Sequence, residues 1–174
     1  MRGYFGIGSE GLSKAHNLGT ILRTAHAFGA SFAFTVGSEL DAGLVRQTDT
    51  SGSSTHLPYY PWPDFASAQF PQGCVLVGVE LTDDAVNLPS FKHPLNAAYI
   101  LGPEKGSLSP AVQDACAHIV KIPTAFCVNV GVAAAITLYD RSILFGGHAP
   151  RPLIQHPRSR HRKFARKTGL GKNR

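Results

Sequence analysis

The first group of residues that could do chemistry lies between residues 17 and 29. Asn17 and Arg23 are six positions apart, which on a helix places Arg23 about 120° around the axis from Asn17. Gly19 in the same helix would cost ~1 kcal/mol relative to alanine, so it indicates close approach of another backbone. Arg23 borders the apolar face of this helix and would need a partner if it were buried. From chemistry alone, the favoured explanation is a surface arginine whose stem covers part of the core.

Two further segments place a polar side chain where a strand is expected to end. Gly102 and Glu104 directly follow an apolar run, and Asn129 lies between the apolar run that ends at Ile122 and a long apolar segment. Ligands of open parallel sheets bind at the carboxyl ends of strands, and glycine lets a ligand approach the backbone closely. Each segment also has a simpler explanation, which is a tight turn for the first and a helix N-cap for Asn129.

A glycine-rich stretch near the N-terminus, Gly6–Gly11, matches the spacing of a dinucleotide-binding loop. That fingerprint requires a helix that opens on the loop and an acidic residue ~20 positions further on. Here residues 13–17 separate the loop from the expected helix, and Glu39 and Asp41 come too late. We therefore interpret the stretch as a strand-to-helix loop.

The elements that would position these segments alternate between strands and helices. Short apolar runs indicate strands, and apolar residues at helical spacing indicate helices. Strands are expected at 4–7, 31–36, 75–79, 98–101 and 119–122, and helices at 16–29, 63–70, 109–117 and 129–145. Residues 47–63 are expected to form a long irregular segment of the kind that serves as a binding loop. The alternation predicts an α/β domain with a mostly parallel sheet flanked by helices.

The cationic residues are concentrated at the C-terminus. Residues 151–174 contain nine of the 17 Lys and Arg residues, while all 11 acidic residues lie before them. We expect a folded domain at 1–149 and a basic tail at 150–174, disordered or loosely docked until it binds RNA phosphates without sequence preference. A solvated tail that only aids solubility is the alternative.

Several classes of protein are not expected. No apolar run reaches the ~18 residues of a membrane helix, and residues 1–7 lack the apolar region of a signal peptide, which favours a cytoplasmic protein without a membrane partner. Cys74, Cys116 and Cys127 form no CxxC pair. We expect reduced, mostly buried cysteines and no metal site.

In their order and spacing, the three polar segments resemble the motifs of the SpoU–TrmH family of RNA ribose 2′-O-methyltransferases, part of the SPOUT superfamily. The resemblance covers residues 4 to about 145. The first motif is matched by Asn17, Gly19, Arg23, Ala25, Phe28 and Gly29. The second is matched by Leu101, Gly102 and Glu104. The third is matched by Ile122, Pro123, Asn129, Val130, Val132, Ala133 and Leu138–Asp140, and a weaker signature by Thr50–Ser53 and His56–Pro58.

The resemblance implies a C-terminal deep trefoil knot, a rare exception to normal topology. It implies that S-adenosyl-L-methionine binds in the knot and that the protein is a homodimer in which the partner subunit completes each site. The residues implied to bind this methyl donor are Leu81, Gly102, Ile122, Cys127 and Val128. The implied catalytic residues are Arg23, Asn17, Glu104 and Asn129, with Arg23 orienting the ribose-phosphate and stabilising the developing alkoxide.

The implied substrate is tRNA or rRNA. We expect tRNA first, because the chain lacks the extended N-terminal RNA-binding domain of larger members. Three departures from the family pattern are Ser107 in place of a glycine, a short loop before Asn129 that carries Cys127, and Gly131 where many members have serine. These departures leave two alternatives, which are a non-catalytic RNA-binding module and an enzyme that methylates a base.

Overall fold

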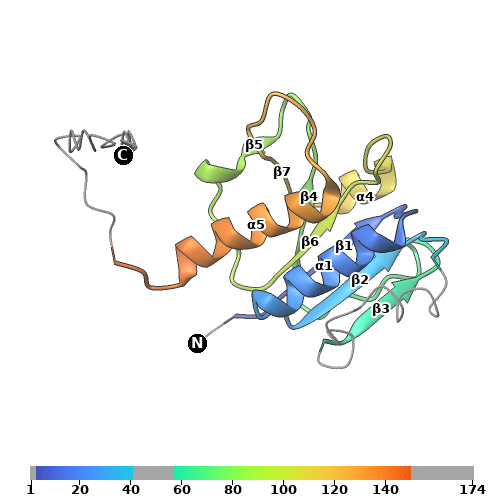
Figure 1. Cartoon of the computed structure of the whole chain (residues 1–174), viewed down its shortest axis with the longest axis horizontal. Coiled ribbons are helices and arrows are strands. Elements are labelled where there is room, and N and C mark those ends of the chain that lie inside the picture. Colours follow the sequence, from blue (N-terminus) through green and yellow to red (C-terminus); the bar gives the residue numbers. More distant parts are fainter. Residues whose placement is uncertain (1–2, 41–56, 150–174) are drawn as a thin grey trace, which may run out of the picture.

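A computed structural model describes residues 3–40 and 57–149 as one α/β unit (Figure 1). Seven strands, all paired in parallel, form one sheet in the order β3-β2-β1-β6-β4-β7-β5. The strands are β1 (Phe5–Glu10), β2 (Phe32–Val36), β3 (Tyr59–Trp62), β4 (Val75–Val79), β5 (Val86–Asn87), β6 (Ala97–Leu101) and β7 (His118–Lys121). The helices are α1 (Ala15–Ala27), α4 (Pro110–Ala115), α5 (Val130–Phe145) and a 3-10 turn, Leu88–Ser90. The predicted α/β class with a parallel sheet flanked by helices is confirmed.

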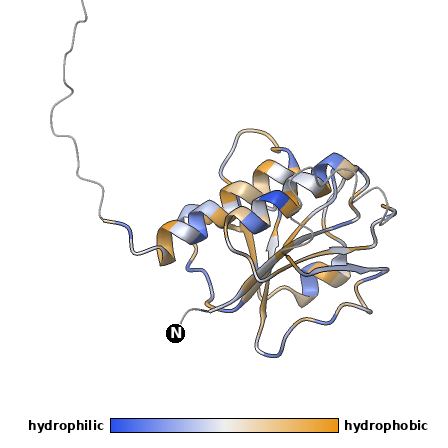
Figure 2. Ribbon diagram, turned by 60° about the horizontal axis from the view of Figure 1, so that its bottom comes forward, coloured by the Kyte–Doolittle hydropathy of each residue, from blue (hydrophilic) through white to orange (hydrophobic). Residues whose placement is uncertain are grey.

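Helices cover both faces of the sheet, which explains why its central strands are apolar throughout. In β6, Tyr99 and Leu101 join the core beneath α1 and α5, while Ala98 and Ile100 join a second core on the face of α4. Strands buried on both faces are continuous apolar runs, with no alternation of polar residues. α1 and α5 lie side by side on the first face, and hydrophobic residues occupy much of α5 (Figure 2).

The prediction of a helix at 63–70 is wrong. The segment forms turns and bends, and the Asp64 carboxylate accepts hydrogen bonds from the Ser67 backbone N–H at 2.8 Å and hydroxyl at 2.7 Å. Such side-chain bonds offer the backbone an alternative to helical pairing. Phe65 and Phe70 pack against the second core from this turn.

Strand β3 lies inside the segment that was expected to be irregular. Pro61 in its middle cannot donate a hydrogen bond, so sequence alone argues against a strand. The sheet order resolves the conflict, because β3 is an edge strand that needs one bonded side only. Residues 41–56, which include Thr50–Ser53 and His56 of the weaker signature, lie outside the described residues.

A buried polar cluster lies at the C-terminal end of α5. Arg141 is 6% exposed, and its guanidinium donates to the Pro94 carbonyl at 2.5 Å, the Leu95 carbonyl at 2.7 Å and the Tyr99 hydroxyl at 3.1 Å. The same guanidinium lies over the Phe5 ring at 4.8 Å. Arg141 thereby joins α5, the segment before β6 and the first strand.

His93 completes this cluster. Its Nδ1 and the Tyr99 hydroxyl are 2.6 Å apart, and its Nε2 lies 3.0 Å from the Asp140 carboxylate. Burial lowers the pKa of His93, and the hydrogen bond to Asp140 opposes that shift. Burial also raises the pKa of Tyr99 to about 12, although Arg141 acts in the opposite direction. The cluster therefore has a neutral imidazole and a neutral phenol at neutral pH.

Candidate active site

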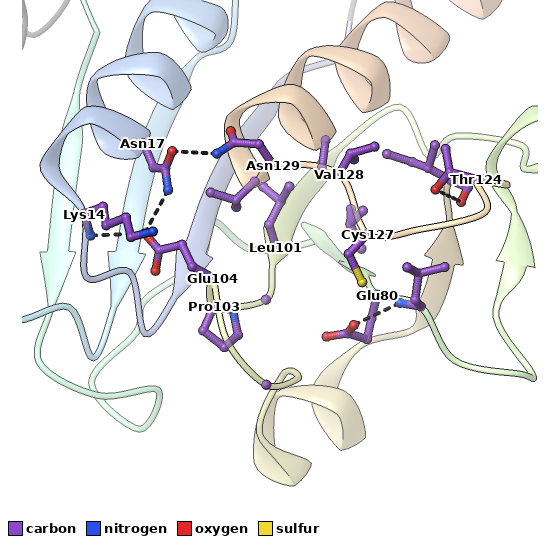
Figure 3. A pocket seen from close by; sticks show the side chains of 17 residues that line it. Lys14, Asn17, Glu80, Leu101, Pro103, Glu104, Thr124, Cys127, Val128 and Asn129 are labelled. Atoms are coloured by element: carbon purple, nitrogen blue, oxygen red, sulfur yellow. Dashed lines mark hydrogen bonds between the residues drawn. The ribbon is translucent and has the colours of Figure 1, made fainter.

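A cavity of about 420 Å³ opens at the carboxyl ends of the central strands. Its walls come from the segments that follow β4, β6 and β7, from the loop before α1 and from the first turn of α5 (Figure 3). The lining residues are Lys14, Asn17, Val79, Glu80, Leu81, Leu101, Gly102, Pro103, Glu104, Gly106, Ile122, Thr124, Cys127, Val128, Asn129, Val130 and Ala133. Segments that are more than a hundred residues apart in the sequence meet here because parallel strands end at the same edge.

All five residues expected to bind the methyl donor line this cavity, namely Leu81, Gly102, Ile122, Cys127 and Val128. Cys127 is exposed, so the expectation of mostly buried cysteines is wrong at this position. Cys74 and Cys116 are half-buried and free, and burial raises the pKa of Cys116 to about 12. Cys127 follows β7 on a loop at the cavity edge, which explains its exposure.

Three of the four residues expected to be catalytic form one hydrogen-bonded chain. The Asn129 amide donates to Asn17 Oδ1 at 2.9 Å, and the Asn17 amide donates to Glu104 Oε1 at 2.9 Å (Figure 3). Asn129 Oδ1 also accepts from the Gly131 backbone N–H at 2.9 Å, which makes Asn129 the N-cap of α5. The chain therefore ties the starts of α1 and α5 to the loop after β6.

The Glu104 carboxylate has no free acceptor position. Oε1 accepts from Asn17 and from the Lys14 backbone N–H, while Oε2 accepts from the Ser13 backbone N–H and hydroxyl, all between 2.9 and 3.1 Å. Four donors fill the roughly four lone-pair positions of a carboxylate. Burial raises the pKa of Glu104, but the hydrogen bonds from Asn17 and Ser13 together lower it by more. The net pKa is therefore below its ordinary value. Glu104 is an ionised residue that holds the loop before α1 in place.

Glu80 is a cavity residue that the sequence analysis did not single out. It directly follows β4, where Oε1 accepts from the Leu81 backbone N–H and Oε2 from the Leu108 backbone N–H, both at 2.9 Å. A Cβ atom at Gly102 would lie 2.7 Å from Glu80 Oε2. The available signal was an acidic residue immediately after an apolar strand and immediately before Leu81.

Arg23 does not line the cavity. It is exposed on the outer face of α1, together with His16, Thr20 and Ala27. The structure thus brings Asn17, Glu104 and Asn129 together and leaves Arg23 outside their hydrogen-bonded chain.

The outer face of α5 adjoins this surface of α1. Thr20 lies against Gly131, where a Cβ atom would be 2.6 Å from Thr20 Cγ2. Because Thr20 fills this space, a serine at position 131 would need Thr20 to move. Further along, α5 exposes large apolar side chains, namely Val132, Tyr139, Ile143, Leu144 and Phe145.

The described residues also bear on membrane and metal binding. Among residues 3–40 and 57–149, no helix is long and apolar enough to cross a membrane. Within the same ranges, no group of His, Cys, Asp and Glu side chains is arranged to hold a metal ion.

Comparison with known proteins gives consistent matches. Residues 5–139 match the SpoU rRNA Methylase family. The chain is 32% identical over 154 residues to a tRNA (guanosine(18)-2′-O)-methyltransferase of Thermus thermophilus, covering 83% of this chain and 78% of that protein. It is 29% identical over 140 residues to the 23S rRNA (guanosine-2′-O-)-methyltransferase RlmB of Nitrosomonas europaea, covering 75% of this chain.

The fold also matches solved structures. The AdoMet-bound rRNA methyltransferase from Sinorhizobium meliloti superimposes with a TM-score of 0.69 at 26% identity, covering 83% of this chain and 58% of that one. The chain spans 53% of the length of RlmB. The matched region includes the cavity and the segments that carry its polar residues.

Proposed function

Since this chain belongs to the SpoU rRNA Methylase family, we propose that it transfers a methyl group from S-adenosyl-L-methionine to a ribose 2′-hydroxyl of RNA. The observation that carries the proposal is the cavity at the strand ends, which is bounded by residues of all three motifs, including Asn17, Gly102 and Asn129. The site carries this proposal, since one fold can serve many functions.

The residues around the cavity fit the methyl donor. A volume of about 420 Å³ lies in the range of small-molecule pockets, which combine apolar walls with a few polar groups. Leu101, Ile122 and Val130 offer apolar surface for an adenine ring, while Glu80 and the backbone of Gly102 offer polar contacts. S-adenosyl-L-methionine would supply an electrophilic methyl group on a cationic sulfonium.

Arg23 is proposed to act on the RNA, in the active site of the partner subunit. A neutral hydroxyl is a poor nucleophile and needs help to lose its proton. A permanently protonated guanidinium would stabilise the developing alkoxide and orient the neighbouring phosphate. Arg23 is exposed on α1 and lies outside the cavity of its own subunit, which fits action on a second subunit.

The surface that would form the homodimer is the outer face of α1 and α5. It combines Arg23 and Thr20 with exposed apolar side chains of α5 such as Val132 and Ile143. Contiguous exposed apolar surface marks interaction sites in soluble proteins. An isologous contact would place the Arg23 of each subunit near the other subunit.

Complementation between two inactive variants tests this arrangement. Arg23→Ala removes the guanidinium, and Gly102→Val crowds the donor cavity, where even a Cβ atom meets Glu80 Oε2. We expect each variant alone to lose methyl transfer from tritiated donor to bulk RNA. Randomly mixed subunits should recover about a quarter of wild-type turnover if Arg23 acts across the dimer, because half the dimers are mixed and each has one intact site.

The outcomes separate the components of the proposal. Action of Arg23 within its own subunit would give no recovery on mixing. Near-wild-type turnover by Arg23→Ala alone would remove its catalytic role. Calorimetry should show that Arg23→Ala still binds the donor and that Gly102→Val does not. Lys92→Ala, which removes another exposed cation, serves as the charge-matched control.

Two alternative functions predict different results in the tritium-transfer assay. A non-catalytic RNA-binding module is favoured by Gly131, and it would transfer no tritium in any variant. A base methyltransferase would transfer tritium, but nuclease digestion and mass spectrometry would find the methyl group on the base. The Thermus thermophilus relative, a tRNA methyltransferase, is covered over 78% of its length, whereas the 23S rRNA methyltransferase RlmB is covered over 53%. This difference supports tRNA ahead of rRNA as the substrate. Methylation maps of total RNA with and without the gene would identify the nucleotide.

The C-terminal features of the sequence stay predictions. We propose that the segment from β7 through α5 belongs to a deep trefoil knot and that residues 1–149 form the folded domain.

The basic tail at 150–174 lies outside the described residues and is proposed to bind RNA. Truncation after Pro150 should weaken RNA binding and flatten the dependence of log affinity on log salt, while donor binding stays intact. Unchanged affinity and slope would leave the tail a solubility role only.

A further inference from the structure

Three glutamates lie at the carboxyl ends of the central strands, and all three accept backbone hydrogen bonds from neighbouring loops. Glu10 ends β1 and accepts from the Ser109 N–H at 2.7 Å. Glu104 follows β6 and its acceptor positions are filled. Glu80 follows β4 and accepts one N–H on each carboxylate oxygen. The three residues share a loop-holding role but differ in how much acceptor capacity remains.

Glu80 combines remaining capacity with a place in the cavity wall. A carboxylate offers about four lone-pair positions, so two are left after the bonds from Leu81 and Leu108. Glu10 does not line the cavity, whereas Glu80 does. The two backbone bonds fix the carboxylate, so a ligand would meet an acceptor that is already oriented.

The space that Glu80 occupies is made by Gly102. A Cβ atom at Gly102 would come within 2.7 Å of Glu80 Oε2, a separation that real Cβ contacts essentially never show. The absence of a side chain at Gly102 thus lets the carboxylate lie between the ends of β4 and β6. This position is flanked by apolar cavity residues, Val79 and Leu101.

We propose that the Glu80 carboxylate binds the ribose of the methyl donor's adenosine, by accepting hydrogen bonds from its 2′- and 3′-hydroxyls. This inference rests on the proposed function of the cavity. One open position on each oxygen matches two hydroxyls on adjacent carbons. The apolar walls beside Glu80 suit the purine to which that ribose is attached. In this role Glu80 binds the methyl donor and takes no part in proton transfer.

The alternative partner within the same donor is the ammonium group of its methionine portion, and a third possibility is that Glu80 only holds loops. The test is calorimetry on the full-length chain with three probes. These are S-adenosylhomocysteine, its 2′-deoxy analogue, and methylthioadenosine, which keeps the ribose but lacks the amino acid. The variant is Glu80→Gln, and the matched control is Glu10→Gln, which alters a loop-holding glutamate outside the cavity.

We expect Glu80→Gln to weaken S-adenosylhomocysteine and methylthioadenosine by the same factor, about 10- to 100-fold, as for hydrogen bonds to a charged group. Removal of the 2′-hydroxyl should weaken binding to wild type by about tenfold and to Glu80→Gln much less. Glu10→Gln should leave all three affinities nearly unchanged. Gly102→Ala, which displaces the carboxylate while keeping Glu80, should reproduce the loss of discrimination against the 2′-deoxy analogue.

Three results would overturn the proposal. Equal penalties for the 2′-deoxy analogue in wild type and Glu80→Gln would show that Glu80 does not contact the 2′-hydroxyl. Loss of affinity for S-adenosylhomocysteine but not for methylthioadenosine would assign Glu80 to the ammonium group. Equal losses of affinity in Glu80→Gln and Glu10→Gln would show that Glu80 only holds loops. Failure of wild type to bind S-adenosylhomocysteine would instead remove the proposed function, and this inference with it.

Discussion

The two ends of α5 carry hydrogen-bonded networks that are built alike and exposed differently. At its start, Asn129 joins Asn17 and Glu104 beside the cavity. At its end, Arg141 joins Tyr99 and the segment before β6 in the protein interior. Each network connects segments that are distant in sequence. The first borders open space, whereas the second is enclosed.

This difference in exposure predicts that one network contributes mainly to stability and the other mainly to ligand binding. The enclosed network is centred on a guanidinium that is only 6% exposed and lies away from the cavity, so its loss should cost mainly folding free energy. The cavity network is partly exposed, and its loss should cost less stability and more ligand affinity. A single helix therefore fixes the fold at one end and positions the site at the other.

The largest expected effect is at the enclosed end. Arg141→Met removes three hydrogen bonds and leaves the Pro94 and Leu95 carbonyls and the Tyr99 hydroxyl short of a donor. We expect the free energy of unfolding in urea to fall by about 3 kcal/mol, because each group that loses its partner costs about 1–3 kcal/mol and two of the three bonds are only part-buried. Exposed Arg23→Met should change it by less than ~0.5 kcal/mol. A loss below about 1 kcal/mol at Arg141 would show that the C-terminal end of α5 contributes little to the folding free energy.

A second change tests the packing between α1 and α5 next to the cavity. Gly131→Ala places a methyl group 2.6 Å from Thr20 Cγ2. Overpacking costs about 1–3 kcal/mol, offset in part by the better helix propensity of alanine. We expect a net loss of about 1 kcal/mol in the free energy of unfolding. Thr20→Ala should remove most of that loss in the double variant, and additive effects would rule out the contact as its cause.

The cavity network itself is tested by Glu104→Gln. The amide would turn an N–H group toward donors from Asn17 or Ser13, so we expect a loss of up to about 1 kcal/mol at neutral pH because the site is partly exposed. The folded-state pKa of Glu104 is below the ordinary value of 4.5. Its contribution is therefore fully present above pH 4.5 and is lost as pH falls through the lowered pKa. Urea titrations of both proteins should converge at low pH, while donor affinity at neutral pH falls in the variant.

The smallest expected effect is the pH dependence that His93 gives to the enclosed end. Burial lowers its pKa below the ordinary 6.5, so the folded state binds fewer protons than the unfolded state just below that pH. Stability from neutral His93 is therefore complete above pH 6.5 and decreases as pH falls toward the lowered pKa. His93→Gln should flatten the slope of unfolding free energy against pH in this window. An unchanged slope would assign the dependence to other histidines.

The sequence predicted those parts of the molecule that depend on local pattern. Apolar runs located five of the seven strands, and helical spacing located α1, α4 and α5. β3 was missed because Pro61 is tolerated only at a sheet edge, and edge position is a property of the whole sheet. The helix expected at 63–70 failed because the Asp64 side chain bonds to Ser67 and competes with the helix.

The site was predictable only in part for a similar reason. Motif resemblance placed Leu81, Gly102 and Ile122, and the structure puts them in one cavity. It did not find Glu80, because an acidic residue after a strand is common and only its contact with Leu108 distinguishes it. The contact between Thr20 and Gly131 links residues in different motifs, and no spacing rule within either motif reveals it.

The sheet order has a consequence for synthesis of the chain. β1 lies at the centre of the sheet and pairs with β6, where Phe5 is opposite Ala97. During translation at ~5–20 residues per second, roughly 5–20 s separate the appearance of these two strands. One edge of an apolar strand stays without its partner for that time, and α1 must wait longer still for α5. We therefore expect nascent chains that stop before residue 97 to be aggregation-prone and to recruit chaperones, however stable the finished domain is.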